Sequence, residues 1–191
     1  MTILYLHGFN SAPQSRKAQE LKRYLEERGL GDRFACPQLP HRPSEAIALT
    51  ELEIAARAPG TVTLAGSSLG GFYATHLAEK HALRAVLLNP AVMPQRDLES
   101  YLGTQQNLYT GEPYELTRGH IAEWRALDAS TIHPERYLLI VETGDEVLDY
   151  REALRKYAGA RAIVIEGGDH SLASFPEHLP AILEFAGLAP L

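Results

Sequence analysis

The stretch LAGSSLGGFYA, residues 64–74, gives the clearest indication of how this sequence folds. It lies between an apolar run at 62–65 and a segment at 70–81 that has helical character, and its letters GSSLG fit the pattern G-x-S-x-G. In that pattern a serine occupies a strained turn between a strand and a helix, with glycines where a Cβ would collide with neighbouring backbone. The register predicts a nucleophile elbow with Ser68, not Ser67, as the nucleophile.

Two common phosphate-binding patterns are absent from this glycine-rich turn. A dinucleotide-binding loop requires G-x-G-x-x-G, and a phosphate-binding loop ends in G-K-[ST]; neither pattern occurs here. The motif alone is also compatible with a strand-to-helix turn that carries no chemistry, because five-residue patterns recur by chance.

The composition is that of an ordinary globular protein. The chain has 191 residues, of which 45% are hydrophobic, and this length predicts a single domain over 1–191. The formal net charge is -6, and no extended basic cluster is present, so we do not expect nucleic acid as a partner. Cys36 is the single cysteine and no zinc-ligand spacing occurs, so we expect neither a disulfide nor a structural metal.

The beginning of the chain, MTILYLHGFN, has an apolar run too short for a signal-peptide core, and no later run approaches membrane-spanning length. From this we expect a cytoplasmic protein without a membrane span. The oligomeric state is not indicated.

Short apolar runs alternate with amphipathic segments, as in a βαβ fold with a parallel sheet. The expected strands are 2–6, 34–36, 62–65, 85–88, 137–142 and 162–165. The expected helices are 15–28, 43–58, 70–81, 149–157 and 176–185. Residues 93–135 are too long for an ordinary loop, and we expect them to form a partly helical, cap-like insertion over one end of the sheet.

A nucleophilic serine needs a base and an acid that orients it, and in this fold they follow in the order Ser, Asp or Glu, His at the ends of later strands. Asp145 follows the strand at 137–142, and His170 follows the strand at 162–165. Glu146 and Asp149 are rivals for the acid. Asp145 is preferred because it directly follows a Thr-Gly turn off the strand.

The oxyanion of an acyl-transfer reaction needs two backbone N–H groups. We expect one from Leu69, the residue after the serine, and the other from Phe9 in the loop YLHGFN that follows the first strand. His7 lies in the same loop, where support of the backbone is a better expectation than catalysis. His7, Asn10 and Arg16 are also candidates for substrate binding. Arg16, with Lys17, Lys22 and Arg23 on the expected helix after this loop, could bind the phosphates of a CoA leaving group; the alternative is a solvated basic helix face.

The phrases YLHGFNSAPQSRKA, LAGSSLGGFYATHLA, LLNPAV, TGDEVLDYREA and EGGDHS resemble the YqiA-type small bacterial esterases, uncharacterised protein family 0227 of the α/β-hydrolase superfamily. The resemblance runs nearly end to end. It implies an esterase for acyl-CoA thioesters and short activated esters, with Ser68, Asp145 and His170 as the catalytic residues and Phe9 and Leu69 as the oxyanion hole.

Together, these observations predict an α/β three-layer sandwich with about six parallel strands in the order 2-1-3-4-5-6 and a small cap at 93–135. Because the chain begins almost directly with a strand, we do not expect the antiparallel hairpin that opens larger α/β hydrolases. The expected activity is cofactor-free hydrolysis of a small ester or acyl-CoA through an acyl-enzyme. The alternative is a non-catalytic binding or interaction protein of the same fold.

Overall fold

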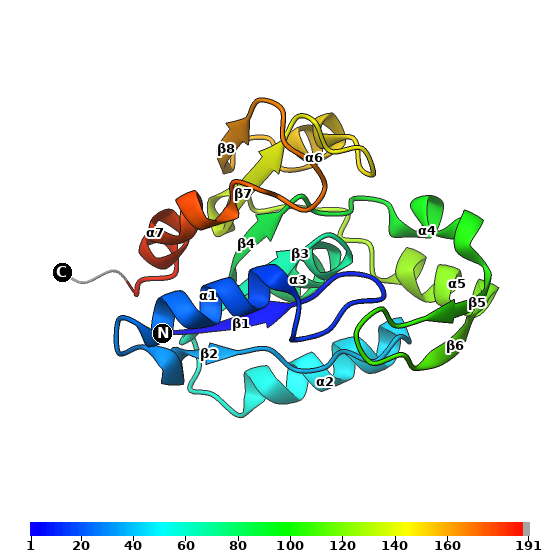
Figure 1. Ribbon diagram of the computed structural model, residues 1–191, viewed down its shortest axis with the longest axis horizontal. Helices are drawn as coiled ribbons and strands as arrows, with labels where there is room; N and C mark the ends of the chain where they lie inside the picture. Colours follow the sequence, from blue (N-terminus) through cyan, green and yellow to red (C-terminus); the bar gives the residue numbers. More distant parts are fainter. Residues whose placement is uncertain (189–191) are drawn as a thin grey trace.

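A six-stranded parallel sheet forms the centre of the protein in the computed structural model, which describes residues 1–188 (Figure 1). The strand order is β2-β1-β3-β4-β7-β8, so the predicted order is confirmed, with β7 and β8 as the fifth and sixth strands. The strands are β1 (Thr2–Leu6), β2 (Phe34–Ala35), β3 (Val62–Ser67), β4 (Arg84–Leu88), β7 (Tyr137–Glu142) and β8 (Arg161–Ile165).

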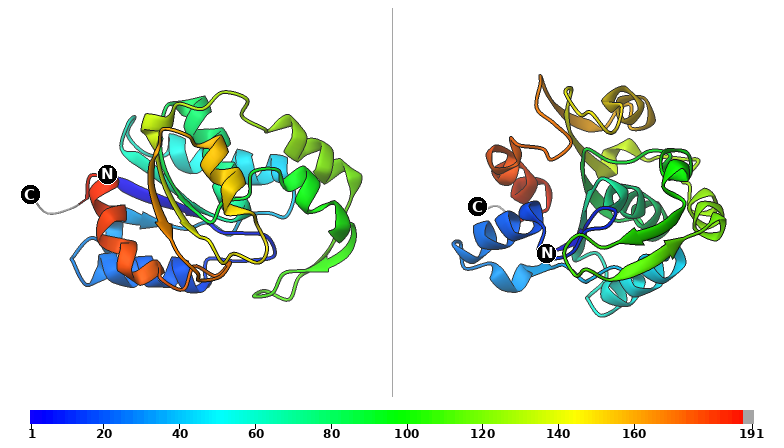
Figure 2. Two further views of the ribbon diagram at one scale, coloured as in Figure 1. Left: turned by 90° about the horizontal axis from the view of Figure 1, so that it is seen from above. Right: turned by 45° about the vertical axis from the view of Figure 1, so that its right-hand side comes forward.

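Helices cover both faces of the sheet and produce the three predicted layers (Figure 2). One face packs against α1 (Arg16–Glu26) and α7 (Phe175–Phe185), and the other against α2 (Pro43–Ala55), α3 (Leu69–His81) and α6 (Tyr150–Lys156). The ends of these helices differ from the expected ends by one to three residues at most, as is usual where terminal turns fray.

The central strands are apolar because both of their faces are covered. Every residue of β3 and of β7 is buried, which explains why these runs lack the alternation of a half-exposed strand. By contrast, β8 lies at the edge of the sheet, and its burial is partial.

The insertion differs from its prediction in having a β component. Gly103–Gln106 (β5) and Pro113–Leu116 (β6) form a separate two-stranded antiparallel sheet, which the sequence did not predict because these strands are short and largely polar. The rest of this part of the chain is partly helical: α4 (Pro94–Asp97) and η2 (Glu99–Tyr101) precede the hairpin, and α5 (Arg118–Ala126) and η3 (Pro134–Arg136) follow it. A further short helix, η1 (Gly31–Arg33), precedes β2.

The hairpin lies beyond the carboxyl ends of the sheet strands, beside the loop that follows β1 (Figures 1 and 2). The backbone carbonyl of Asn10 accepts a hydrogen bond from the Leu108 N–H (2.9 Å), and that of Ser11 accepts one from the Asn107 side chain (2.8 Å). The loop after β1 is therefore attached to the insertion.

Within residues 1–188, no helix is long and apolar enough to cross a membrane.

Candidate active site

Ser68 stands alone between β3 and α3, in the turn that the sequence predicted to be an elbow. Its φ and ψ are 54° and -120°, a strained backbone conformation that persists only where surrounding contacts impose it. A Cβ on Gly66 would overlap the backbone of Gly70, and one on Gly70 would overlap the Leu6 carbonyl of β1. The two glycines are thus required by the close approach of helix, turn and strand.

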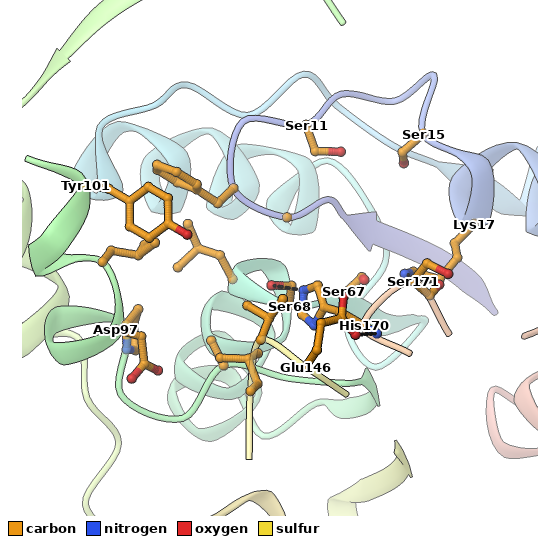
Figure 3. Close-up of a pocket in the computed structure, with 18 of the residues that line it drawn as sticks. Ser11, Ser15, Lys17, Ser67, Ser68, Asp97, Tyr101, Glu146, His170 and Ser171 are labelled. Carbon is orange, nitrogen blue, oxygen red and sulfur yellow. Dashed lines mark hydrogen bonds between the residues drawn. The ribbon is translucent and has the colours of Figure 1, made fainter. Parts of the chain in front are cut away.

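A hydrogen-bonded chain joins Ser68 to His170 and Asp145. The Oγ of Ser68 lies 3.1 Å from Nε2 of His170, and Nδ1 of His170 lies 2.8 Å from Oδ2 of Asp145 (Figure 3 shows the serine and the histidine). A neutral imidazole with its proton on Nδ1 donates to the carboxylate and leaves Nε2 free to accept from the serine hydroxyl.

The carboxylate of Asp145 is fixed by its own loop. Only 2% of its side chain is exposed, and Oδ1 accepts hydrogen bonds from the N–H groups of Val147 and Leu148, each at 2.8 Å. The rival acids have other partners: Asp149 caps α6 by accepting from the Arg151 N–H, and Glu146 accepts from the backbone N–H of His170 (3.0 Å). The structure therefore brings Asp145, of the three acids, to Nδ1 of His170.

Two buried polar residues that no sequence motif indicated lie behind His170. Glu142, the last residue of β7, is 1% exposed, and Asn89, directly after β4, is 3% exposed. Both bond to the backbone of Asp169. For Glu142 the sequence did contain one signal, an acidic residue at the end of the apolar run YLLIVE. An acidic residue at the end of a buried strand indicates bonded partners nearby, because charged side chains are almost never fully buried without them.

A cavity of about 630 Å³ opens at Ser68 and His170. Its walls differ in character. Apolar side chains line one part, and they include Phe9, Leu69, Leu98, Tyr101 and Leu148; hydroxyl and basic groups line another, and they include Ser11, Ser15, Arg16, Lys17 and Ser171 (Figure 3).

The loop after β1 meets the elbow at Gly8, where the Cβ of any larger residue would lie 3.3 Å from Cβ of Ser68. Phe9 and Leu69 both line the cavity beside the serine. Leu69 is the first residue of α3, where the backbone N–H has no acceptor one turn earlier in the helix.

His7 and Asn10 do not line this cavity. The imidazole of His7 is 4% exposed; its Nε2 accepts from the Leu39 N–H (3.0 Å) and its Nδ1 lies 3.1 Å from the Gly8 carbonyl. Burial lowers the pKa of His7, in keeping with a neutral ring that connects two backbone segments. The Asn10 side chain bonds to two residues of the hairpin, Gln105 and Tyr114. Both residues line a neighbouring cavity of about 330 Å³, which shares Gly8, Phe9 and Leu69 with the first cavity. Contact between substrate and these two side chains stays a prediction.

Arg16 lines the cavity, but its guanidinium is partly occupied. It donates to the backbone carbonyls of Ser171 (2.8 Å) and Leu172 (3.0 Å), which directly follow His170. Lys17 donates to the same Ser171 carbonyl (2.8 Å), and burial lowers its pKa to about 8. These two basic residues hold the segment after His170 as well as facing the cavity.

The aromatic residues of the insertion divide between the cavity and the core. Tyr101 and Tyr109 line the cavity, where Tyr101 meets Phe9 edge-on at 5.8 Å between ring centres. Tyr114 instead stacks on His41 (4.3 Å), and the fully buried Trp124 donates from Nε1 to the Tyr73 hydroxyl (2.8 Å).

In the described part of the chain, no group of three or more His, Cys, Asp or Glu side chains is arranged to hold a metal ion.

The sheet order and the serine elbow define an α/β-hydrolase fold. A protein from Agrobacterium vitis, provisionally named a hydrolase, superposes with a TM-score of 0.74 at 21% identity, covering 97% of this chain and 87% of that one. Est1E from Butyrivibrio proteoclasticus, with ferulic acid bound, gives 0.65 at 15% identity (96% and 87% covered), and an esterase domain from Rhodothermus marinus gives 0.66 at 15% identity (97% and 85% covered).

The family follows from the sequence over almost its full length. Residues 2–187 match the model of the uncharacterised protein family UPF0227, and the chain belongs to that family. The resemblance expected from the sequence motifs is thereby confirmed.

Proposed function

We propose that this protein is a serine hydrolase that cleaves a carboxylic ester or an acyl thioester through an acyl-enzyme. The observation that carries the proposal is the chain from Asp145 through His170 to Ser68, placed on a strained elbow at the edge of a cavity. The esterase names of two structural neighbours support the same class of reaction.

In the proposed reaction, Ser68 Oγ attacks the acyl carbon while Nε2 of His170 takes the hydroxyl proton. Asp145 stabilises the imidazolium that forms. The oxyanion of the tetrahedral intermediate accepts hydrogen bonds from the backbone N–H groups of Phe9 and Leu69.

Collapse of the intermediate breaks the bond to the leaving group, which takes the proton from His170. Water then attacks the acyl-Ser68 ester, with His170 as base, and a second collapse releases the acid and restores the serine. No step in this sequence calls on a cofactor.

The apolar wall near Tyr101 fits an acyl chain, and the hydroxyl and basic wall near Lys17 fits a polar part of the substrate. A small ester or an acyl-CoA is therefore the proposed substrate class.

Covalent labelling with a fluorophosphonate tests the proposal, because only an activated serine reacts quickly. We expect one adduct, on Ser68, and hydrolysis of p-nitrophenyl and acyl-CoA esters across a series of chain lengths. A folded protein that takes no adduct and hydrolyses none of these esters would instead be a binding protein of this fold.

A further inference from the structure

A buried carboxylate lies directly behind the loop that carries His170. Glu142 directs all of its side-chain hydrogen bonds to that loop: Oε2 accepts from the Asp169 N–H (2.7 Å), and Oε1 accepts from the N–H (3.0 Å) and the hydroxyl (2.5 Å) of Ser174. Burial by itself raises the pKa of such a carboxyl. Here the hydrogen bonds from Ser174 and from the backbone prevail, and the pKa of Glu142 lies below its usual value.

The loop is shaped around this carboxylate. Gly168 has a φ of 72°, and a Cβ at this position would overlap the Glu142 carboxyl group. Only glycine adopts this conformation readily and also leaves room for the oxygen atoms. Gly168, the second of the paired glycines before His170, therefore makes room for Glu142.

Asn89 completes the support from the neighbouring strand. Its Nδ2 donates to the Asp169 carbonyl (3.0 Å), and its Oδ1 accepts from the Glu142 N–H (2.9 Å). Two buried side chains thus hold the backbone of Asp169. Glu142, at the end of β7, bonds to its N–H, and Asn89, directly after β4, bonds to its C=O. The residue next to Asp169 is His170.

We propose that Glu142 is a positioning residue for His170: its charged carboxylate fixes the 169–174 loop so that Nε2 stays within hydrogen-bonding distance of Ser68 Oγ. The inference rests on the proposed serine-hydrolase function. Its physical basis is that general-base catalysis depends on geometry, and a displacement of about 1 Å lowers turnover by roughly 100-fold. Glu142 does not line the cavity at Ser68, so we expect substrate affinity to be unaffected.

Glu142→Gln tests the proposal because it keeps the shape of the side chain and removes the charge. An amide has one acceptor oxygen, so it cannot serve Asp169 and Ser174 together, and its NH₂ group faces an N–H donor. We expect kcat for a short p-nitrophenyl ester to fall roughly 10- to 100-fold with KM within about twofold. The rate of fluorophosphonate labelling should fall in parallel, and the low-field proton NMR signal of His170 Nδ1–H should weaken or disappear.

Glu79→Gln is the matched control. Glu79 is also a well-bonded acid with a 12% exposed side chain, but its partners are His133, Arg136 and Tyr137, at the end of α3 remote from Ser68. This variant should lose thermal stability while kcat and the His170 signal stay as in the wild type.

The outcomes separate the two proposals. If Glu142→Gln melts earlier, as Glu79→Gln does, but keeps its kcat, labelling rate and His170 signal, Glu142 is merely structural and the inference is overturned. If the wild type itself shows neither turnover nor labelling, the serine-hydrolase proposal fails, whereas the NMR signal still reports whether Glu142 positions His170.

Should Glu142→Gln not fold, Ser174→Ala removes one donor to the same carboxylate, and we expect a decrease of a few fold in kcat at unchanged KM; an unchanged kcat in that variant would also overturn the inference.

Discussion

Two regions of the molecule differ in how they are held together. One is the edge of the sheet formed by the carboxyl ends of its strands, which carries Ser68, Asp145 and His170 and is called the sheet edge below. The other is the insertion at 93–135. At the sheet edge, buried strands end in turns whose backbones touch, and the polar groups there are buried and bonded. The insertion is attached through a largely polar hairpin whose tip residue Leu108 is 81% exposed. Tight packing permits one arrangement, whereas a solvated hairpin tolerates change.

This difference suggests a division of labour. The sheet edge holds the groups that would carry out the reaction, and the insertion supplies part of the cavity wall through Tyr101 and Tyr109. Substitutions at the sheet edge should therefore change kcat, and substitutions in the insertion should change the choice of substrate.

Removal of the proposed nucleophile should have the largest effect. Ser68→Ala should lower kcat for ester hydrolysis by about 10⁴-fold or more without unfolding the protein, because the three residues act as a unit. Ser67→Ala, at the buried end of β3, should lower it far less. Steady-state kinetics of both variants checks this prediction. Equal losses of kcat would contradict the assignment of Ser68, rather than Ser67, as the nucleophile of the elbow.

Asp145→Asn should rank second. Without its charge the imidazolium of His170 loses stabilisation, and we expect a loss of about 10³- to 10⁴-fold in kcat. Asp149→Asn should stay within about tenfold of the wild type, because Asp149 is bonded to Arg151 and not to the histidine. A reversed order in the kinetic constants would transfer the role to Asp149.

A change in the insertion should alter selectivity instead. Tyr101→Ala removes part of the apolar wall that packs against Phe9. Each methylene of an acyl chain gains about 0.8 kcal/mol from burial, so we expect KM to rise several-fold for p-nitrophenyl octanoate and to change little for the acetate. Leu108→Ala, at the exposed tip of the hairpin, is the control and should leave both esters unaffected. An equal loss of activity for all acyl-chain lengths would contradict the proposal that the insertion determines the choice of substrate.

The smallest effect is expected from a change at Arg16, which both lines the cavity and bonds to the segment after His170. Because Arg16 bonds to the carbonyls of Ser171 and Leu172, Arg16→Ala should lower kcat a few fold for charged and uncharged substrates alike. Arg28→Ala, just beyond the carboxyl end of α1, is the control and should leave kcat unchanged for both kinds of substrate. An increase in KM confined to acyl-CoA, and lost at high salt, would instead assign Arg16 to binding of the anionic leaving group.

The motifs of the sheet edge were predictable because their reasons are local. The elbow at Ser68 needs glycines at fixed positions, and strands buried on both faces need unbroken apolar runs, so the sequence indicated the strands and the candidate residues. The strand order came from these runs together with the family resemblance. The same local rules failed for β5 and β6. These strands are short and largely polar, and the hairpin that they form is bonded to Asn10 and Ser11, which are distant in the sequence.

The parallel sheet and the positions of Ser68 and His170 at its carboxyl end follow from the sequence, since alternating apolar runs and glycine spacing leave few other folds, and the family resemblance adds the strand order. Which acid reaches His170 depends on tertiary contacts, because Asp145, Glu146 and Asp149 differ in direction rather than in chemistry. Tertiary contacts also bury Glu142 behind the His170 loop and bond His7 to Leu39 and Asn10 to the hairpin. Hydrogen bonds between segments far apart in the chain set those directions, and no local pattern of letters encodes them.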